Sequence, residues 1–191
     1  MKILCVSDQI DPLVYSSSVK NRFTDVELIL SAGDLPLDYL DFIVTNLNKP
    51  LLFVFGNHHA EEKTNSDTGA FGSTHLDSKI RTEAGLIIAG LGGSMRYNQG
   101  PNQFTERQMY FEIAKLIPSM IINRLFRGRF LDILLTHAPP FGATLGFWSE
   151  YWTNQVLLIK FSFAALARDG RNKKSSTHIG SRPIRKFLAA A

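Results

Sequence analysis

The sequence predicts an α/β fold, because apolar runs with the character of buried strands alternate with segments of helical length. Four runs rich in Ile, Leu, Val and Phe each end at a cluster of polar residues, and a fifth ends in glycines. Short continuous apolar runs that stop at Gly or Pro are typical of strands buried on both faces. Helical segments separate the first three runs, which is the pattern of a parallel or mixed sheet.

Five strands are therefore expected. The first contains the only cysteine, Cys5, which we interpret as a small buried core residue and which excludes an internal disulfide. After the third run, the polar residues 60–80 are expected to form an exposed loop. The predicted strands cover residues 2–8, 26–34, 50–59, 85–94 and 130–140.

Helices are predicted over residues 12–23, 38–47 and 105–127. In the second of these, apolar residues recur at positions i, i+3, i+4 and i+8, which indicates one buried face. In the third, four apolar side chains are expected to be buried. These are Phe111, Ala114, Leu116 and Ile117.

The chain of 191 residues is long enough for one domain with its own core. Its composition, 45% hydrophobic and 20% charged residues, is ordinary for a soluble globular protein. We expect a single domain over residues 1–191, in which residues 142–176 are a divergent or inserted segment. Asp8 interrupts the apolar N-terminus, so no signal peptide is expected and a cytoplasmic location is the default.

Within the divergent segment, residues 156–167 form an apolar run that is too short to predict a membrane span. A helix packed on the core is one interpretation of this run. A helix that lies on a membrane surface or binds a partner is the other, and the sequence leaves both open.

Positive charge is concentrated near the C-terminus. Of the net charge of +4, residues 160–191 carry +7 and residues 1–159 carry −3. A basic segment suits contact with nucleic acid or anionic lipid, but a solvated basic face is the simpler interpretation. No aromatic residues lie among the charges of residues 168–186, where a stacking platform for single strands would need them.

Polar side chains follow four of the predicted strands, namely Asp8, Asp34, Asn57 and His137. Taken alone, Asp8 and Asp34 would fit a helix cap or a turn, Asn57 would fit a turn, and His137 would fit a hydrogen-bonded loop histidine. In an α/β sheet, however, the carboxyl ends of parallel strands meet at one edge, where ligands bind. Together these oxygen and imidazole donors predict a site for a divalent ion, Mn, Fe, Zn or Mg. The neighbouring His58 is placed to reach a reacting group.

These residues resemble the motifs of the calcineurin-like metallophosphoesterases, in the same order along residues 1–140. The resemblance implies a fold of two β-sheets flanked by helices, an αββα sandwich. The matching motifs are Ser7-Asp8, Gly33-Asp34, Gly56-Asn57-His58 and Thr136-His137.

The resemblance also implies a pair of metal ions about 3.5–4 Å apart, which polarise a phosphoryl group and lower the pKa of a water molecule toward about 7. By this resemblance, Asp8 would bind the first ion and Asp34 would bridge both. Asn57 and His137 would bind the second ion. His58 would stabilise the transition state or protonate the leaving oxygen.

The sequence departs from the family pattern at three motifs. Ile10 stands where the first motif, Asp-any-His, has its histidine, and His59 stands where the third usually has an acidic residue. The C-terminal motif Gly-His-any-His is absent, while residues 177–188 resemble the segment that leads into it. We therefore expect the fold to be incomplete at its C-terminus.

These departures reduce the number of metal ligands. The first ion would keep only Asp8 and Asp34, unless Asp11 or His59 substitutes for the missing histidines. Two side chains are too few for a tight site, so a single ion or weak occupancy is expected.

We predict a metal-dependent phosphoesterase that acts on a phosphomonoester or phosphodiester, with a small molecule or a nucleotide as its substrate. Arg96, in the glycine-bearing residues 92–98, is a candidate for holding a substrate phosphate. A surface arginine beside a glycine turn explains it as well. One alternative is a catalytically silent domain of the same type that binds a partner or a phosphate ligand. A nucleic-acid-binding module is a third hypothesis, which rests on the basic tail alone.

Overall fold

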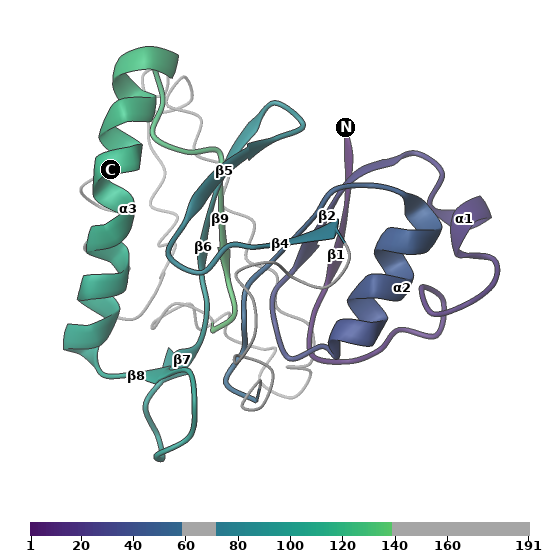
Figure 1. The fold of residues 1–191 in the computed structure, drawn as a ribbon, viewed down its shortest axis with the longest axis horizontal. Coiled ribbons are helices and arrows are strands. Elements are labelled where there is room, and N and C mark those ends of the chain that lie inside the picture. Colours follow the sequence, from purple (N-terminus) through teal and green to yellow (C-terminus); the bar gives the residue numbers. More distant parts are fainter. Residues whose placement is uncertain (59–71, 139–191) are drawn as a thin grey trace, which may run out of the picture.

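The computed structural model describes residues 1–58 and 72–138 and has a mixed α/β fold, which confirms the predicted class. Helices α1 and α2 lie on one side of the strands and α3 lies on the other (Figure 1). The elements of the described residues are β1 (Lys2–Val6), α1 (Val19–Arg22), β2 (Val26–Ser31), α2 (Leu37–Leu47), β3 (Leu51–Phe53), β4 (Ser73–His75), β5 (Ile80–Glu83), β6 (Leu86–Leu91), β7 (Ser94–Met95), β8 (Gln103–Phe104), α3 (Glu106–Arg127) and β9 (Ile133–Thr136).

Parallel strands form the first sheet, in the order β1-β2-β3-β4. Leu30 of β2 pairs with Cys5 of β1 on one side and with Leu52 of β3 on the other. Because these strands run in one direction, their carboxyl ends share one edge. The residues that follow β1, β2 and β3 meet at that edge.

The second sheet has the order β5-β6-β9, with β6 and β9 parallel and β5 antiparallel to β6. Leu91 pairs with Thr136 at the carboxyl ends of β6 and β9. An isolated bridge between Asp77 and Gly90 connects the end of the first sheet to β6. Strands β7 and β8 form a small parallel pair beside these ends.

Buried apolar side chains form clusters between successive layers. One cluster joins α2 to the first sheet and contains Ile43 and Ile29, another lies between the sheets and contains Leu30 and Ile88, and a third joins α3 to the second sheet. Side chains alternate in direction along a strand. Ile29 therefore faces α2 while its neighbour Leu30 faces the second sheet.

Two predictions of secondary structure, a helix over residues 12–23 and a loop over residues 60–80, are wrong. In place of a helix over residues 12–23, only the short helix α1 forms, and residues 12–18 make turns. Ser16 Oγ donates to Leu13 O over 3.0 Å there, and serine side chains that bond to nearby backbone compete with helix formation. The range 60–80 is not entirely a loop either. It contains β4, which pairs with β3 through backbone hydrogen bonds that polar residues make as readily as apolar ones.

Helix α3 begins where the sequence predicts, because Thr105 and Gln108 form a capping box. Thr105 Oγ1 accepts a hydrogen bond from the Gln108 backbone N–H over 3.3 Å, and Gln108 Oε1 accepts one from the Thr105 N–H over 2.9 Å. These bonds satisfy two of the donors that a helix start leaves without partners.

The buried face of α3 differs from the one expected. Leu116 is buried, but Phe111 is 70% exposed, and Ala114 and Ile117 are exposed too. The expected residues lie on a different side of the helix from the residues that face the second sheet. The residues that face the sheet recur at positions i, i+4, i+7 and i+11. They are Met109, Ile113, Leu116 and Met120.

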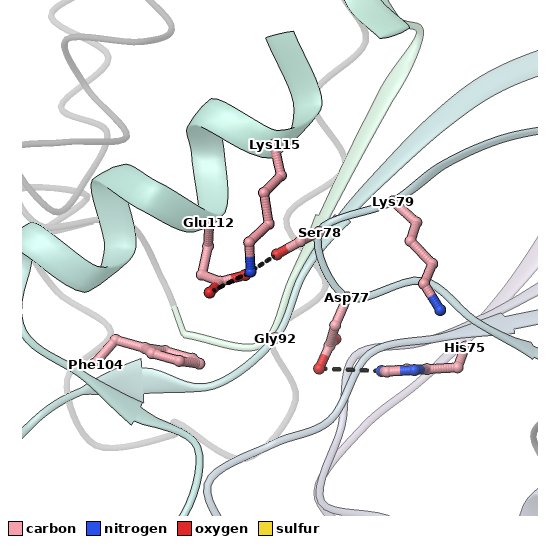
Figure 2. A pocket seen from close by; sticks show the side chains of 8 residues that line it. All are labelled: His75, Asp77, Ser78, Lys79, Gly92, Phe104, Glu112 and Lys115. Carbon is pink, nitrogen blue, oxygen red and sulfur yellow. Dashed lines mark hydrogen bonds and ion pairs between the residues drawn. The ribbon is translucent and has the colours of Figure 1, made fainter. Parts of the chain in front are cut away.

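A cavity of about 360 Å³ lies where α3 meets the junction of the two sheets (Figure 2). Glu112 of α3 accepts hydrogen bonds from Ser78 Oγ over 2.5 Å and from Lys115 Nζ over 2.7 Å. His75 Nε2 lies 3.1 Å from Asp77 Oδ2. The Ser78–Glu112 hydrogen bond therefore fastens α3 to the sheet junction, and the His75–Asp77 pair lies on the sheet side of the cavity.

No helix within residues 1–58 and 72–138 is long and apolar enough to cross a membrane. The divergent segment 142–176, its apolar run 156–167 and the basic residues 168–186 lie outside the described residues.

Candidate functional site

Asp8 and Asp34 follow the neighbouring strands β1 and β2, and both occupy the left-handed region of backbone space. Their φ angles are +59° and +58°. Asp tolerates this region better than most residues because its short side chain bonds locally. The Asp8 N–H donates to Gly33 O over 3.0 Å, which ties the two turns together. Such conformations are costly, and they concentrate at functional sites.

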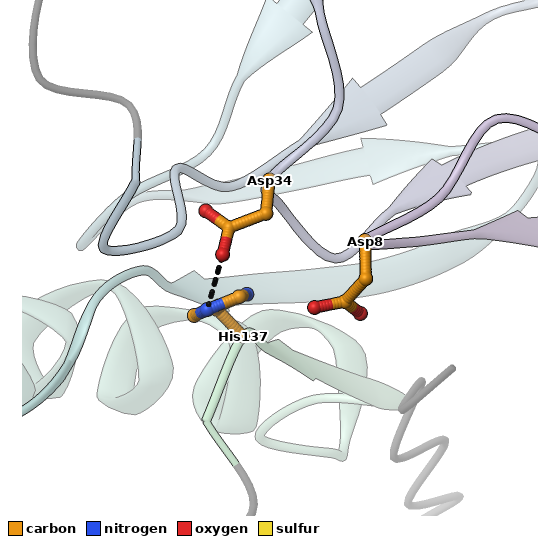
Figure 3. Close-up of side chains that lie close together, drawn as sticks. All are labelled: Asp8, Asp34 and His137. Carbon is orange, nitrogen blue, oxygen red and sulfur yellow. Dashed lines mark ion pairs between the residues drawn. The ribbon is translucent and has the colours of Figure 1, made fainter. Parts of the chain in front are cut away.

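The two carboxylates meet the imidazole of His137, which follows β9 (Figure 3). One potential ligand atom from each of Asp8, Asp34 and His137 lies within 4.8 Å of the others. His137 Nε2 is 3.4 Å from Asp34 Oδ2, and both of these side chains are only 9% exposed, whereas Asp8 is exposed. A group of this kind has the donors to hold a metal ion, although exposed acidic groups are common without one.

A backbone carbonyl orients the ring of His137. His137 Nδ1 lies 2.7 Å from Ala32 O. A carbonyl oxygen can only accept, so Nδ1 carries the hydrogen and, in the neutral ring, Nε2 keeps its unshared pair. That nitrogen faces Asp34 Oδ2 and also Asn57 Oδ1, which is 3.0 Å away. An unshared pair and two acceptor oxygens repel one another unless a cation lies between them or Nε2 is itself protonated.

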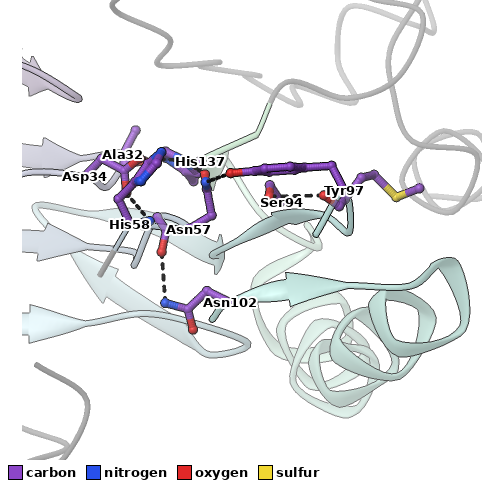
Figure 4. Close-up of polar contacts among 10 residues, drawn as sticks. Ala32, Asp34, Asn57, His58, Ser94, Tyr97, Asn102 and His137 are labelled. Atoms are coloured by element: carbon purple, nitrogen blue, oxygen red, sulfur yellow. Dashed lines mark hydrogen bonds and ion pairs between the residues drawn. The ribbon is translucent and has the colours of Figure 1, made fainter. Parts of the chain in front are cut away.

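Asn57 reaches this cluster from the loop after β3. Its Oδ1 faces His137, and its Nδ2 donates to the hydroxyl of Tyr97 over 2.7 Å (Figure 4). Behind it, Asn102 Nδ2 donates to Gly56 O over 2.9 Å. The sequence alone indicates neither Tyr97 nor Asn102 as a site residue, because a tyrosine or asparagine in a polar loop carries no periodic signal.

Gly33 and Gly56 are required by close packing around these side chains. A Cβ on Gly33 would lie 2.8 Å from His137 Nδ1 and 2.7 Å from the Gly56 nitrogen. A Cβ on Gly56 would overlap the Asp34 carboxylate and lie 2.8 Å from His137 Cε1. The glycines in front of Asp34 and Asn57 therefore leave the space that the cluster occupies.

His58 lies beside the cluster and is exposed. Its backbone N–H donates to Asp34 Oδ1 over 3.1 Å. The hydrogen bond holds the backbone of His58 against the carboxylate while the side chain remains accessible to a ligand.

Other residues from the sequence analysis lie apart from the cluster. The Arg96 guanidinium donates to Gln108 Oε1 over 3.1 Å and to Gln103 O over 3.4 Å, at the start of α3. Asp11 Oδ1 accepts from the Leu13 N–H over 2.7 Å within its own turn. A phosphate-binding role for Arg96 stays a prediction, and His59 lies outside the described residues.

Comparison of the chain with protein-family models and with curated proteins finds no match in either set. A function must therefore be inferred from the residues themselves. The edge of the sheets carries two carboxylates, an amide oxygen and an imidazole nitrogen, donors that suit a hard or borderline divalent cation.

Proposed function

We propose that the chain is a metal-dependent phosphoesterase of the calcineurin-like type, which hydrolyses a phosphomonoester or a phosphodiester. The observation that carries the proposal is the orientation of His137. Its Nδ1 donates to Ala32 O, so its Nε2 faces Asp34 Oδ2 and Asn57 Oδ1 at 3.4 and 3.0 Å. A divalent cation at this point would turn a set of mutually repelling acceptors into ligands.

The donor set fits such an ion. Asp34 would lie between two positions, one shared with Asp8 and the other with Asn57 and His137, as the family resemblance implies. Carboxylate, amide and imidazole donors suit Mn, Fe, Zn or Mg. When bound, the ion would act as a Lewis acid on a phosphoryl oxygen and would lower the pKa of a water molecule.

The residues of the chain then have separate tasks. Asp34 is held by the His58 N–H and lies against the Nε2 of His137, so its carboxylate has a defined direction. The His58 side chain is exposed next to this carboxylate. It is therefore available to donate a proton to the leaving oxygen of a phosphoester that lies over the cluster.

One observation favours a second candidate, a catalytically silent domain that binds a partner or a phosphate ligand. Ile10 stands where the family motif has a histidine, and its side chain is 44% exposed. An apolar residue at that position leaves Asp8 without the imidazole partner that the resemblance implies. This weakens the first of the two metal positions but leaves the second unchanged.

Two measurements on the full chain test the proposal, namely Mn²⁺ titration by calorimetry and hydrolysis of bis(4-nitrophenyl) phosphate and 4-nitrophenyl phosphate. We expect weak, Mn²⁺-stimulated turnover. Asp34→Ala should abolish both Mn²⁺ binding and turnover, whereas the matched control Asp38→Ala, an exposed acid on α2, should change neither. His58→Ala should lower turnover and leave Mn²⁺ affinity nearly unchanged.

The two candidates predict different results. Mn²⁺ binding without turnover of either ester would favour the silent domain. Turnover that survives Asp34→Ala would show that the activity belongs to another site or to a contaminant. A wild-type chain that binds no Mn²⁺, Fe²⁺, Zn²⁺ or Mg²⁺ would refute the proposed metal site.

A further inference from the structure

Asn57 can serve as a metal ligand in only one of its two amide orientations. Its Oδ1 is an acceptor and can bind a cation, whereas its Nδ2 carries two hydrogens and cannot. In the structure Oδ1 lies on the side of His137 Nε2, 3.0 Å away, and Nδ2 points to Tyr97 Oη, 2.7 Å away. The tyrosine hydroxyl is thus the acceptor that gives Nδ2 a partner while Oδ1 faces the cluster.

Side-chain hydrogen bonds from Gln103 hold the loop that carries Tyr97. The backbone N–H groups of Tyr97 and Asn98 both donate to Gln103 Oε1 over 3.1 Å. Gln103 Nε2 donates back to Asn98 Oδ1 over 2.6 Å, and Gln103 is 5% exposed. A single buried glutamine side chain therefore sets the backbone of the residue that contacts Asn57.

The same loop is fastened to the residues around Asn57. Asn102, 8% exposed, donates through its Nδ2 to Gly56 O, and the Gly93 N–H donates to Phe55 O over 2.7 Å. These two bonds join the loop to the residues that precede Asn57. The backbone segments that carry the phenol and the amide are therefore held together, which places the two side chains at the 2.7 Å of their hydrogen bond.

We propose that Tyr97 is a positioning residue, which holds the amide of Asn57 with its oxygen toward a bound divalent cation. The inference rests on the proposed function, because it requires a cation at the cluster. Tyr97 itself does not need to touch the cation. Groups that orient metal ligands commonly change metal affinity 10- to 100-fold when they are removed.

Calorimetric titration of the full chain with Mn²⁺ tests this inference through affinity, independently of turnover. Tyr97→Phe removes only the hydroxyl of a side chain that is 64% exposed, so the fold should be retained. We expect it to weaken Mn²⁺ binding about 10-fold. The matched control is Tyr110→Phe on α3, which removes the same group from a residue 40% exposed and should change nothing.

The same substitution in an Asn57→Asp background separates positioning from a general structural effect. A carboxylate presents an oxygen in either orientation, so it depends less on the tyrosine hydroxyl, which can donate to its second oxygen. Tyr97→Phe should therefore weaken Mn²⁺ affinity by a clearly smaller factor in the Asn57→Asp chain than in the chain with Asn57.

Three outcomes would overturn the inference. Equal weakening in both backgrounds would mean that Tyr97 acts through the general structure of the loop. If the wild-type chain bound Mn²⁺ and Tyr97→Phe left the affinity unchanged, the inference would be refuted but the proposed function would not. A wild-type chain that binds no Mn²⁺ at all would remove its premise, the proposed function, and the inference with it.

Discussion

Replacing Gly56 by alanine would place a methyl group inside the candidate site. The added Cβ would overlap the Asp34 carboxylate and lie 2.8 Å from His137 Cε1. Ordinary contacts of a Cβ begin at 3.4 Å. The imidazole would have to move by roughly 0.6 Å and the carboxylate by more, whereas ligand geometry is held within about 0.5 Å in working sites.

Two costs follow from this displacement. Overpacking of this kind lowers the free energy of unfolding by about 1–3 kcal/mol. Displaced ligands should weaken Mn²⁺ binding at least 10-fold, by analogy with the loss of ligand orientation. Gly85→Ala is the control. The added Cβ would have no neighbour within 4 Å, so it disturbs no side chain, but the φ of +78° is strained for alanine. That strain costs about 1–2 kcal/mol, so the control should lose similar stability and keep its Mn²⁺ affinity.

Urea unfolding gives the stability of both variants, and calorimetry gives their affinity for Mn²⁺. The reasoning would be refuted if folded Gly56→Ala bound Mn²⁺ as tightly as the wild-type chain. It would also be refuted if Gly85→Ala lost affinity to the same extent, because strain far from the cluster would then explain both results.

Burial raises the pKa of the Cys5 thiol from 9.0 to about 11. At pH 8, iodoacetamide should therefore alkylate the native chain about 100-fold more slowly than the urea-unfolded chain, as followed by mass spectrometry. Because the unfolded chain ionises first, stability should also fall as pH rises from 9 toward 11; equal alkylation rates would contradict this pKa. Thr105→Ala removes the capping box of α3 and should cost about 1 kcal/mol in urea unfolding, and an unchanged midpoint would show that the cap is dispensable. Ile113→Ala should lower the free energy of unfolding by about 2–5 kcal/mol and Phe111→Ala by less than about 0.5 kcal/mol. The reverse order would mean that the face of α3 with Phe111 is the buried one.

The sequence by itself determined which residues can reach one edge of the sheets. Asp8, Asp34 and Asn57 follow apolar runs that form β1, β2 and β3, and His137 follows the run that forms β9. Parallel strands place their carboxyl ends together, so strand order and polar run ends were sufficient to predict that these residues would meet. The sequence also shows a glycine directly before Asp34 and before Asn57, at the end of each apolar run.

Only the tertiary structure decided which face of α3 is buried and which loop contacts the cluster. The apolar residues of α3 cover more than one face, so its periodicity is compatible with burying Phe111 or Ile113, and the position of the second sheet selects Ile113. Tyr97 meets Asn57 across 40 positions of sequence because Gln103 and Asn102 fold its loop onto the end of β3. Contacts between residues far apart in the sequence depend on the tertiary path of the chain, which a local pattern of polar and apolar residues does not predict.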